Sequence, residues 1–398
     1  MSVQVISQSL SDIALNLTQG NSSSDYFVYG LASGLPFYGL QTTTLRTSDT
    51  IGAGQQVRLV FPTTGLLAPT PLIVRWSDTI TRSAGTANTG FSTYNVLFCW
   101  RSIDLRSASN PIYSLTPHAI LQFMSYTLSP SAYTTWLSMI SSVTLADGTT
   151  QDRTCVLPLL LPGFTDASNL LDLKRSQSNY DLVFTMETPS LWAGSLATSV
   201  AQQSGLGINI DYNWIDLSEA DEKNYVENTY LKSDSSLTKA QVVMVSDPRT
   251  LYVANQAYPL TKSRIVEQIH FYFATAATPQ NPVDVVAGLS TPTVTLNLGS
   301  GSVTVPLISL KAMQLFGNGR NYSSGIDGNV YTINLAAAKN SSAFVGGGAM
   351  KSLSNAFISF NGLQGLSAGS PTISIFYSAK SIYRFSALSG VATEVSTS

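Results

Sequence analysis

Charge is the scarcest property of this sequence. Of its 398 residues only 11% are Asp, Glu, Lys or Arg, against about 25% in an average soluble protein. The net charge is −2, and no Lys or Arg precedes Arg46. A basic arm that wraps nucleic acid needs clustered Lys and Arg to neutralise phosphates. The sequence therefore predicts no direct wrapping of nucleic acid.

Cysteine and histidine are also few, with two of each. Cys99 and Cys155 lie among apolar residues, which favours buried free thiols over a disulfide scaffold. Any Ser-His-Asp or Cys-His site would have to use His118 or His270. We expect His118 at the start of an apolar strand and His270 on the outward face of another. Neither histidine has a catalytic motif around it, so both are interpreted as structural.

Motifs for phosphate binding, for a nucleophile elbow and for zinc are missing. The acidic residues Asp216, Glu219, Asp221 and Glu222 could in principle hold a hard cation through their oxygens. However, Ser218 precedes most of them, and a cap residue followed by acids is typical of a helix start. The sequence therefore predicts no catalytic residue, no cofactor and no metal site.

Long apolar runs are missing too. No stretch is long enough to span a membrane and no secretory signal begins the chain, so we expect a protein made and assembled in soluble form. What the sequence does contain is short apolar runs with a period of two, separated by polar turns. Val57, Leu59 and Phe61 alternate with Arg58 and Val60. This pattern predicts half-buried β-strands.

Comparable runs recur along the whole chain, and few segments have helical periodicity. The predicted strands cover residues 72–76, 94–100, 120–124, 156–161, 182–186, 208–215, 241–245, 266–273, 294–298, 303–308, 330–335, 356–360 and 373–377. Ser129-Pro130 predicts the start of one short helix, and the Gly/Ser run at 299–302 predicts a hairpin loop. The sequence thus indicates an all-β chain.

The length and strand spacing favour two consecutive eight-stranded jelly-roll β-sandwiches, with short helices in loops and at the junction. We predict an amino-terminal arm at 1–24, a first jelly roll at 25–217, a helical linker at 218–240, a second jelly roll at 241–392 and a tail at 393–398. With so little charge repulsion, such a chain tends to associate with copies of itself.

The carboxyl-terminal segment carries the most specific pattern. A strand at 353–361 is followed by a Gly/Ser loop and by the segment 370–391. The residues that matter are Ser381, Tyr383, Arg384, Ser389 and Gly390. This pattern resembles the closing segment of double jelly-roll major capsid proteins of icosahedral DNA viruses, including large eukaryotic DNA viruses, virophages and tectivirus-like phages. In that family an aromatic final strand precedes an aromatic and Arg segment and a Ser-Gly pair.

The resemblance implies a structural protein of the virion, not an enzyme. Three chains would form a pseudo-hexameric homotrimeric capsomer that tiles an icosahedral shell, assembled inside the host cell. Its expected partners are neighbouring capsomers, penton and minor capsid proteins, and an internal membrane reached by the amino-terminal arm. The arm, which contains no Lys or Arg, agrees with a bilayer or a packaging protein lying between coat and genome.

Two other functions remain open at this stage. A receptor-binding or spike protein of a virion could have the same β-sandwich composition, but it would form a discrete oligomer with a ligand pocket. A β-sandwich glycan hydrolase would need two facing carboxylates, and the acids here are scattered over predicted loops.

Overall fold

The computed structural model describes most of the chain from residue 38 onward. The described residues are 38–47, 51–52, 54–82, 94–107, 110–141, 148–162, 164, 170–174, 180–188, 200–202, 207–219, 222–223, 236–247, 249–262, 264–276, 280–286, 291–299, 301–317, 329–336, 347–350, 353, 355–363, 366, 370–386 and 392–395. The predicted arm at 1–24 lies outside them.

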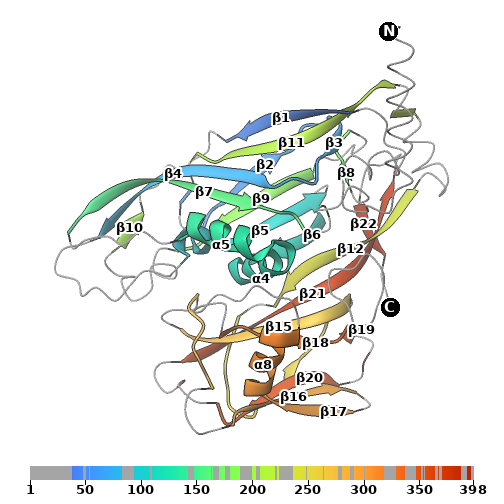
Figure 1. Ribbon diagram of the computed structural model, residues 1–398. Helices are drawn as coiled ribbons and strands as arrows, with labels where there is room; N and C mark the ends of the chain where they lie inside the picture. The colour runs from blue at the N-terminus through green and yellow to red at the C-terminus, as the bar shows by residue number, and fades with distance from the viewer. Residues whose placement is uncertain are drawn as a thin grey trace, which may run out of the picture.

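The first half is a sandwich of two antiparallel sheets (Figure 1). Its strands are β1 (Tyr38–Arg46), β2 (Gln56–Val60), β3 (Leu66–Leu67), β4 (Leu72–Arg82), β5 (Trp100–Ser107), β6 (Asn110–Leu115), β7 (Thr150–Leu159), β8 (Leu171–Asp172), β9 (Tyr180–Met186), β10 (Val200–Gln202) and β11 (Asn209–Leu217). One sheet has the main order β1-β11-β4-β7, with β3, β8 and β10 added, and the other has the order β2-β9-β5-β6.

The second half is built the same way. Its strands are β12 (Ser236–Ser246), β13 (Thr250–Leu251), β14 (Tyr258–Pro259), β15 (Ile265–Thr275), β16 (Thr293–Leu298), β17 (Ser302–Pro306), β18 (Tyr331–Asn334), β19 (Gly348–Ala349), β20 (Ala356–Asn361), β21 (Pro371–Ser386) and β22 (Ala392–Val395). The two sheets have the orders β12-β21-β15-β18, with β13, β19 and β22 added, and β14-β20-β16-β17.

The two halves repeat one topology. The eight main strands of the first half are, in chain order, β1, β2, β4, β5, β6, β7, β9 and β11, and those of the second half are β12, β14, β15, β16, β17, β18, β20 and β21. In one sheet of each half the first strand pairs with the eighth, the eighth with the third and the third with the sixth. Both pair second with seventh, seventh with fourth and fourth with fifth in the other sheet. This arrangement of eight strands in two sheets is the jelly roll, so the predicted double jelly roll is confirmed.

Alternating side chains hold the sheets together, as the period-two pattern predicts. Val57 and Leu59 are buried while Arg58 and Val60 face solvent. Aromatic contacts join the two sheets of each sandwich. Trp76 on β4 meets Trp100 on β5 edge to face at 5.1 Å. In the second sandwich Phe273 on β15 meets Phe360 on β20 at 5.0 Å.

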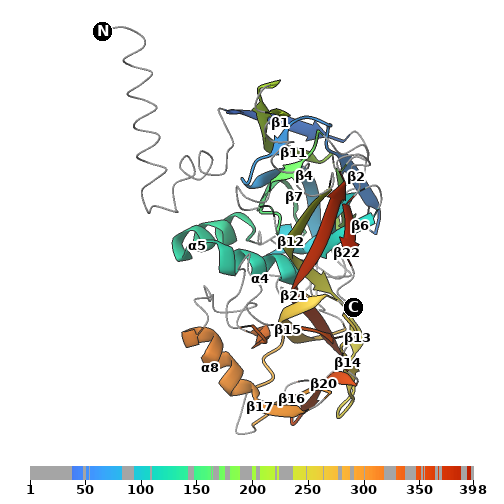
Figure 2. The ribbon, with the colours of Figure 1, turned by 90° about the vertical axis from the view of Figure 1, so that its right-hand side faces the viewer.

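Four helices lie in the described loops: α3 (Asn95–Phe98), α4 (Pro117–Thr127), α5 (Pro130–Met139) and α8 (Leu307–Gly317). The helix predicted after Ser129-Pro130 is confirmed as α5. Viewed from the side, α4, α5 and α8 project from the same side of the molecule (Figure 2). None of the described helices is long and apolar enough to cross a bilayer.

Three predicted strands prove partly or wholly helical. Residues 95–98 form α3, residues 120–124 lie inside α4, and the strand predicted over 303–308 ends at Pro306, so that Leu307 and Ile308 already belong to α8. For α4 the reason is burial on all sides, since residues 117–125 are all buried. A helix without a polar face has the same continuous apolar sequence as a buried strand.

The boundaries also differ in detail. Residues 236–240, predicted to belong to a helical linker, are the start of β12, and β22 occupies 392–395, where a tail was expected from residue 393. The hairpin predicted at 299–302 is confirmed, because β16 and β17 pair directly across it. Its tight turn requires Gly299, whose φ is 86°.

Candidate functional site: the junction of the sandwiches and the open sheet edge

The junction between the sandwiches is formed by the fifth strand of the first, β6, and the first strand of the second, β12, which lie side by side. Arg264 Nη2 donates to the Ile112 carbonyl at 3.2 Å. The hydroxyls of Thr116 and Ser246 are 3.2 Å apart. Both sandwiches share one continuous hydrophobic core, so the chain folds as one body with two similar halves.

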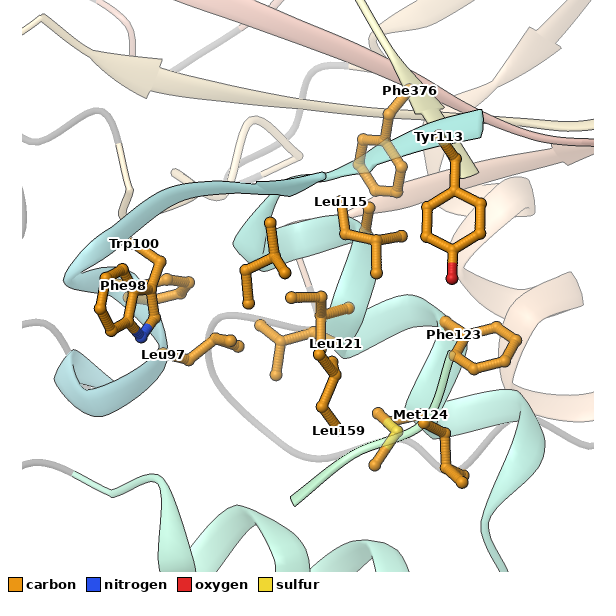
Figure 3. Close-up of a cluster of buried hydrophobic side chains, with 14 of the residues drawn as sticks. Leu97, Phe98, Trp100, Tyr113, Leu115, Leu121, Phe123, Met124, Leu159 and Phe376 are labelled. Atoms are coloured by element: carbon orange, nitrogen blue, oxygen red, sulfur yellow. The ribbon is translucent and has the colours of Figure 1, made fainter. Parts of the chain in front are cut away.

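Helix α4 fills the space behind β6. Figure 3 shows Leu121, Phe123 and Met124 of α4 packed among apolar side chains from several strands, with Phe376 of β21 lying near Tyr113 and Leu115 of β6. Phe376 comes from the second sandwich, whereas all the other labelled residues come from the first. Burying such side chains contributes about 1.5–3 kcal/mol each relative to exposure, which makes the junction a packed interior.

His118 connects α4 to the second sandwich. Its ring lies 4.2 Å from the ring of Tyr272, and Nε2 is 3.1 Å from the Gln280 carbonyl. Because a carbonyl only accepts, Nε2 carries the proton and donates. The pKa of His118 is lowered from 6.5 to about 3, mainly by burial; the contact with Gln280 partly opposes this shift, and the charge of Arg249 adds to it. His118 lies in the first turn of a helix and not at the start of a strand as predicted, and its structural role stays a prediction.

His270 was predicted on the outward face of a strand, and it does lie on the face of β15 turned away from its own sandwich core, but that face is covered and not exposed to solvent. The residue lies in β15 and is fully buried. Its Nδ1 is 3.0 Å from the Thr332 hydroxyl, and its ring stacks on Phe376 at 4.8 Å. The face of β15 turned away from the sandwich core is covered by the first sandwich, where Tyr126 of α4 lies 6.4 Å from the imidazole ring.

An open cleft of about 470 Å³ lies at the same junction. Its two carboxylates are both neutralised. Arg101 Nη2 is 3.0 Å from Glu187 Oε1, and Lys262 Nζ is 2.5 Å from Asp247 Oδ1. Asp247 also accepts from the Tyr377 hydroxyl at 2.5 Å. Carboxylates held in ion pairs are poor partners for acid and base roles in glycan hydrolysis.

The predicted acidic group does not form a cation site among the described residues. Glu222 is ion-paired with Lys174 at 2.5 Å, and the Glu222 amide donates to the Ser218 carbonyl at 2.8 Å, as in a helical turn. Glu219 is exposed, while Asp221 lies outside the described residues. The described part of the chain holds no cluster of three or more metal-ligating side chains.

The carboxyl-terminal pattern falls on the longest strand of the second sandwich. Within β21, Ser381, Tyr383 and Arg384 pair through their backbones with β12, and the last two also face β22. Ser389 and Gly390 lie outside the described residues. The aromatic and Arg segment thus continues a strand that β12 and β22 flank. The functional importance of these five residues stays a prediction.

The second sandwich has an open edge that sequence reasoning missed. Strand β17 is the last strand of its sheet, and Val303 on it is 62% exposed. The helix that follows presents Ile308 and Met313 to solvent, at 51% and 58%. Apolar alternation identified β17 as a strand, but only the tertiary structure reveals that, among the described residues, one of its edges pairs with no other strand.

Comparison with known proteins identifies the fold. No protein-family model matches the chain, and no curated protein sequence matches it. Solved structures do. The crystal structure of VP54 of PBCV-1, fitted into a reconstruction of the virophage Sputnik, matches 91% of this chain and 98% of its own, with 12% identity and a TM-score of 0.67.

The Faustovirus major capsid protein matches 94% of this chain and 92% of its own, with 11% identity and a TM-score of 0.63. The mavirus major capsid protein matches 89% and 90%, with 10% identity and a TM-score of 0.52. These likenesses span both sandwiches, so the whole chain has the fold of viral major capsid proteins.

Proposed function

We propose that this chain is the major capsid protein of an icosahedral virus, a structural component of the virion and not an enzyme. The observation that carries the proposal is the extent of the likeness. VP54 of PBCV-1 matches 91% of this chain and 98% of itself, so the likeness includes both sandwiches and their mutual arrangement. It is not limited to one sandwich of a common type. A fold alone hosts many functions, and the pairing of two such sandwiches is the more specific feature.

The assembly unit is a homotrimer with pseudo-hexameric shape. Hexagonal tiling needs six similar walls, and three chains of two repeated sandwiches supply six. The scarcity of charge supports this assembly, because little electrostatic repulsion separates copies of the chain. Further partners belong to the same proposal: neighbouring capsomers, penton and minor capsid proteins, and an internal membrane contacted by the arm at 1–24.

A spike or receptor-binding role is the second candidate. The cleft at the junction favours it to the extent that a concave site could hold a ligand. Its carboxylates, however, are occupied by Arg101 and Lys262. A spike would remain a discrete oligomer at high concentration, whereas a capsid protein associates further, which distinguishes the two functions.

Analytical ultracentrifugation and electron microscopy of the purified chain at rising concentration test the proposal. The expected result is a species of three times 42.5 kDa, seen as three-fold blocks with six corners, that forms sheets or shells as concentration increases. Persistent monomers would overturn the proposal. A stable trimer that never associates further would favour the spike.

A further inference from the structure

The cleft at the junction is lined by residues of both sandwiches. The first sandwich supplies Arg101 of β5, Ser114 of β6 and the start of α4, and the second supplies Arg249 and Tyr272. The cleft volume of about 470 Å³ lies within the range of small-molecule sites. A molecule held in this cleft would therefore contact both halves of the chain.

The start of α4 leaves backbone donors unused. The first amides of a helix have no acceptor within the helix, and the side chain of the preceding residue usually accepts from one of them. Thr116 precedes α4 but makes no such cap, and its hydroxyl lies 3.2 Å from that of Ser246 instead. The amides of the buried residues His118 and Ala119 donate to no acceptor among the described residues. Free amides at a helix start favour a negatively charged group.

The ring of His118 leaves an acceptor unused as well. His118 is 2% exposed and lines the cleft, and Nε2 donates to the Gln280 carbonyl at 3.1 Å. The ring is neutral at pH 7, since its pKa is lowered to about 3, mainly by burial. Nδ1 can therefore only accept, and it has no partner in the described part of the chain. A ligand that satisfies Nδ1 must carry an O–H or N–H group.

The cleft also holds an excess cation. Each of its two carboxylates already has a cation of its own, Arg101 in one case and Lys262 in the other. Arg249 is exposed and forms no ion pair within the described ranges. Its charge is near enough to the start of α4 to lower the pKa of His118. Arg249 and the unused amides thus favour an anion at the same place.

We propose that the cleft binds a sugar phosphate, with the phosphate group held by the start of α4 and by Arg249. A phosphate has several oxygens, so it can accept from backbone amides and from a guanidinium together. The sugar hydroxyls match the Nδ1 acceptor of His118 and the hydroxyls of Ser114 and Ser374, and the sugar ring fits against Tyr272. Such binding needs neither trimers nor shells, so it goes beyond the capsid role.

Titration of the purified chain with glucose 6-phosphate tests the site, at low ionic strength in a buffer without phosphate or sulfate. Binding to the folded chain should raise the melting temperature, and isothermal titration calorimetry gives the dissociation constant. Inorganic phosphate should bind more weakly and glucose should not bind. If inorganic phosphate binds as tightly as glucose 6-phosphate, the sugar takes no part. If glucuronate binds as tightly, the assignment to phosphate is wrong.

Substitution of Arg249 tests the excess cation. Arg249→Gln should raise the dissociation constant for glucose 6-phosphate by about ten-fold or more, because a hydrogen bond between two charged groups is lost. Arg46→Gln is the matched control. Arg46 is also exposed and without an ion pair among the described residues, but it lies at the end of β1 and does not line the cleft. Equal affinities of the two variants would contradict the proposal.

A carboxylate placed before α4 tests the helix start. In Thr116→Asp the new side chain can accept from the unused amides, and Asp caps helices better than Thr does. We expect glucose 6-phosphate binding to be lost while the melting temperature of the free chain does not fall. A merely structural role of this helix start would predict no change in ligand affinity. Thr116→Asp with the affinity of the unaltered chain would therefore overturn the placement of the phosphate.

Failure of this site and failure of the proposed function give different results. An unaltered chain that does not bind glucose 6-phosphate at millimolar concentration would overturn the site and leave the capsid role intact, because assembly is measured separately by ultracentrifugation. A chain that binds glucose 6-phosphate but stays monomeric would support the site and overturn the proposed function.

Discussion

The two sandwiches have the same strand order but neutralise their buried charge in different ways. In the first, Asp78 on β4 lies opposite Arg153 on β7 in the ladder. Arg153 Nη2 donates to Asp78 Oδ2 at 2.7 Å and Nη1 donates to Asn95 Oδ1 at 2.6 Å. In the second, Lys380 Nζ lies 2.8 Å from Glu267 Oε1, both side chains being inaccessible to solvent.

The two cations differ in whether they can lose their charge when the carboxylate partner is removed. A guanidinium stays charged under any condition that a protein survives, whereas an ammonium can lose its proton when it is buried. In the second sandwich burial also raises the pKa of Glu267, and Lys380 only partly offsets this. The first sandwich therefore depends on its ion pair more than the second sandwich does.

Removing Asp78 should have the largest effect. Asp78→Leu leaves the Arg153 guanidinium buried without its carboxylate, while the Asn95 side chain still accepts one of its hydrogen bonds. We expect a loss of about 3–5 kcal/mol in the free energy of unfolding, measured by urea denaturation at pH 7. Asp78→Leu/Arg153→Met should recover most of the loss, because no buried charge remains. A double variant as unstable as the single one would contradict this explanation.

Removing Glu267 should cost less, on the order of 2 kcal/mol at pH 7, because the remaining lysine can become neutral. The stability deficit of Glu267→Leu should shrink as pH rises from 7 to 9.5, since the unfolded lysine keeps its proton up to about pH 10. The deficit of Asp78→Leu should stay constant over that range. Parallel pH profiles for the two variants would remove the proposed distinction between the sandwiches.

The sequence predicts what local pattern determines. The alternation of Val57 and Leu59 with Arg58 and Val60 identifies β2, and Ser129-Pro130 identifies the start of α5. Cys99 and Cys155 are buried free thiols, as predicted. Repetition of such strands over 398 residues was enough to predict two jelly rolls, because short alternating runs have few other stable arrangements.

What the sequence could not predict depends on contacts between the halves. Helix α4 resembles a strand in sequence because the second sandwich covers it, and His270 is buried because the first sandwich covers β15. Apolar alternation around Val303 predicts a strand there, but it does not reveal that this strand ends its sheet. Whether a strand has a neighbour on each edge is a tertiary property, so neither periodicity nor motif spacing contains it.

Acid should weaken the junction selectively. His118 has a pKa of about 3 when folded, lowered by burial, against 6.5 when exposed. Its contribution to stability is therefore complete above about pH 6.5 and is lost as the pH falls toward 3, because the unfolded chain binds the proton more readily. At pH 5 the loss amounts to about 2 kcal/mol.

Comparison with His118→Phe isolates this contribution. Phenylalanine keeps the ring contacts with Phe98 and Tyr272 but cannot be protonated, so the variant should lose less stability between pH 7 and pH 5. The variant also lacks the bond to Gln280, which lowers its stability equally at both pH values. Thermal melting at pH 7, 6 and 5 measures the difference, and equal slopes would contradict the assignment.

The smallest expected effect on stability concerns the way in which two helices begin. The first helical turn of α5 is capped by a side chain, with the Ala132 amide donating to the Ser129 hydroxyl at 3.4 Å. Helix α8 uses the backbone instead, because the Leu307 amide donates to the Pro292 carbonyl at 2.8 Å. Substitution of a side chain can remove the first cap but not the second.

Ser129→Ala should therefore lower the free energy of unfolding by about 0.5 kcal/mol, the low end for a cap, since the bond is long. Pro306→Ala, the matched change before α8, leaves the carbonyl of Pro292 in place and should cost no more than the flexibility it adds to the unfolded chain. Urea denaturation compares the two. A larger loss of free energy of unfolding for Pro306→Ala than for Ser129→Ala would mean that Pro306, and not the Pro292 carbonyl, fixes the start of α8. The helix starts in the two halves would then differ less than their contacts indicate.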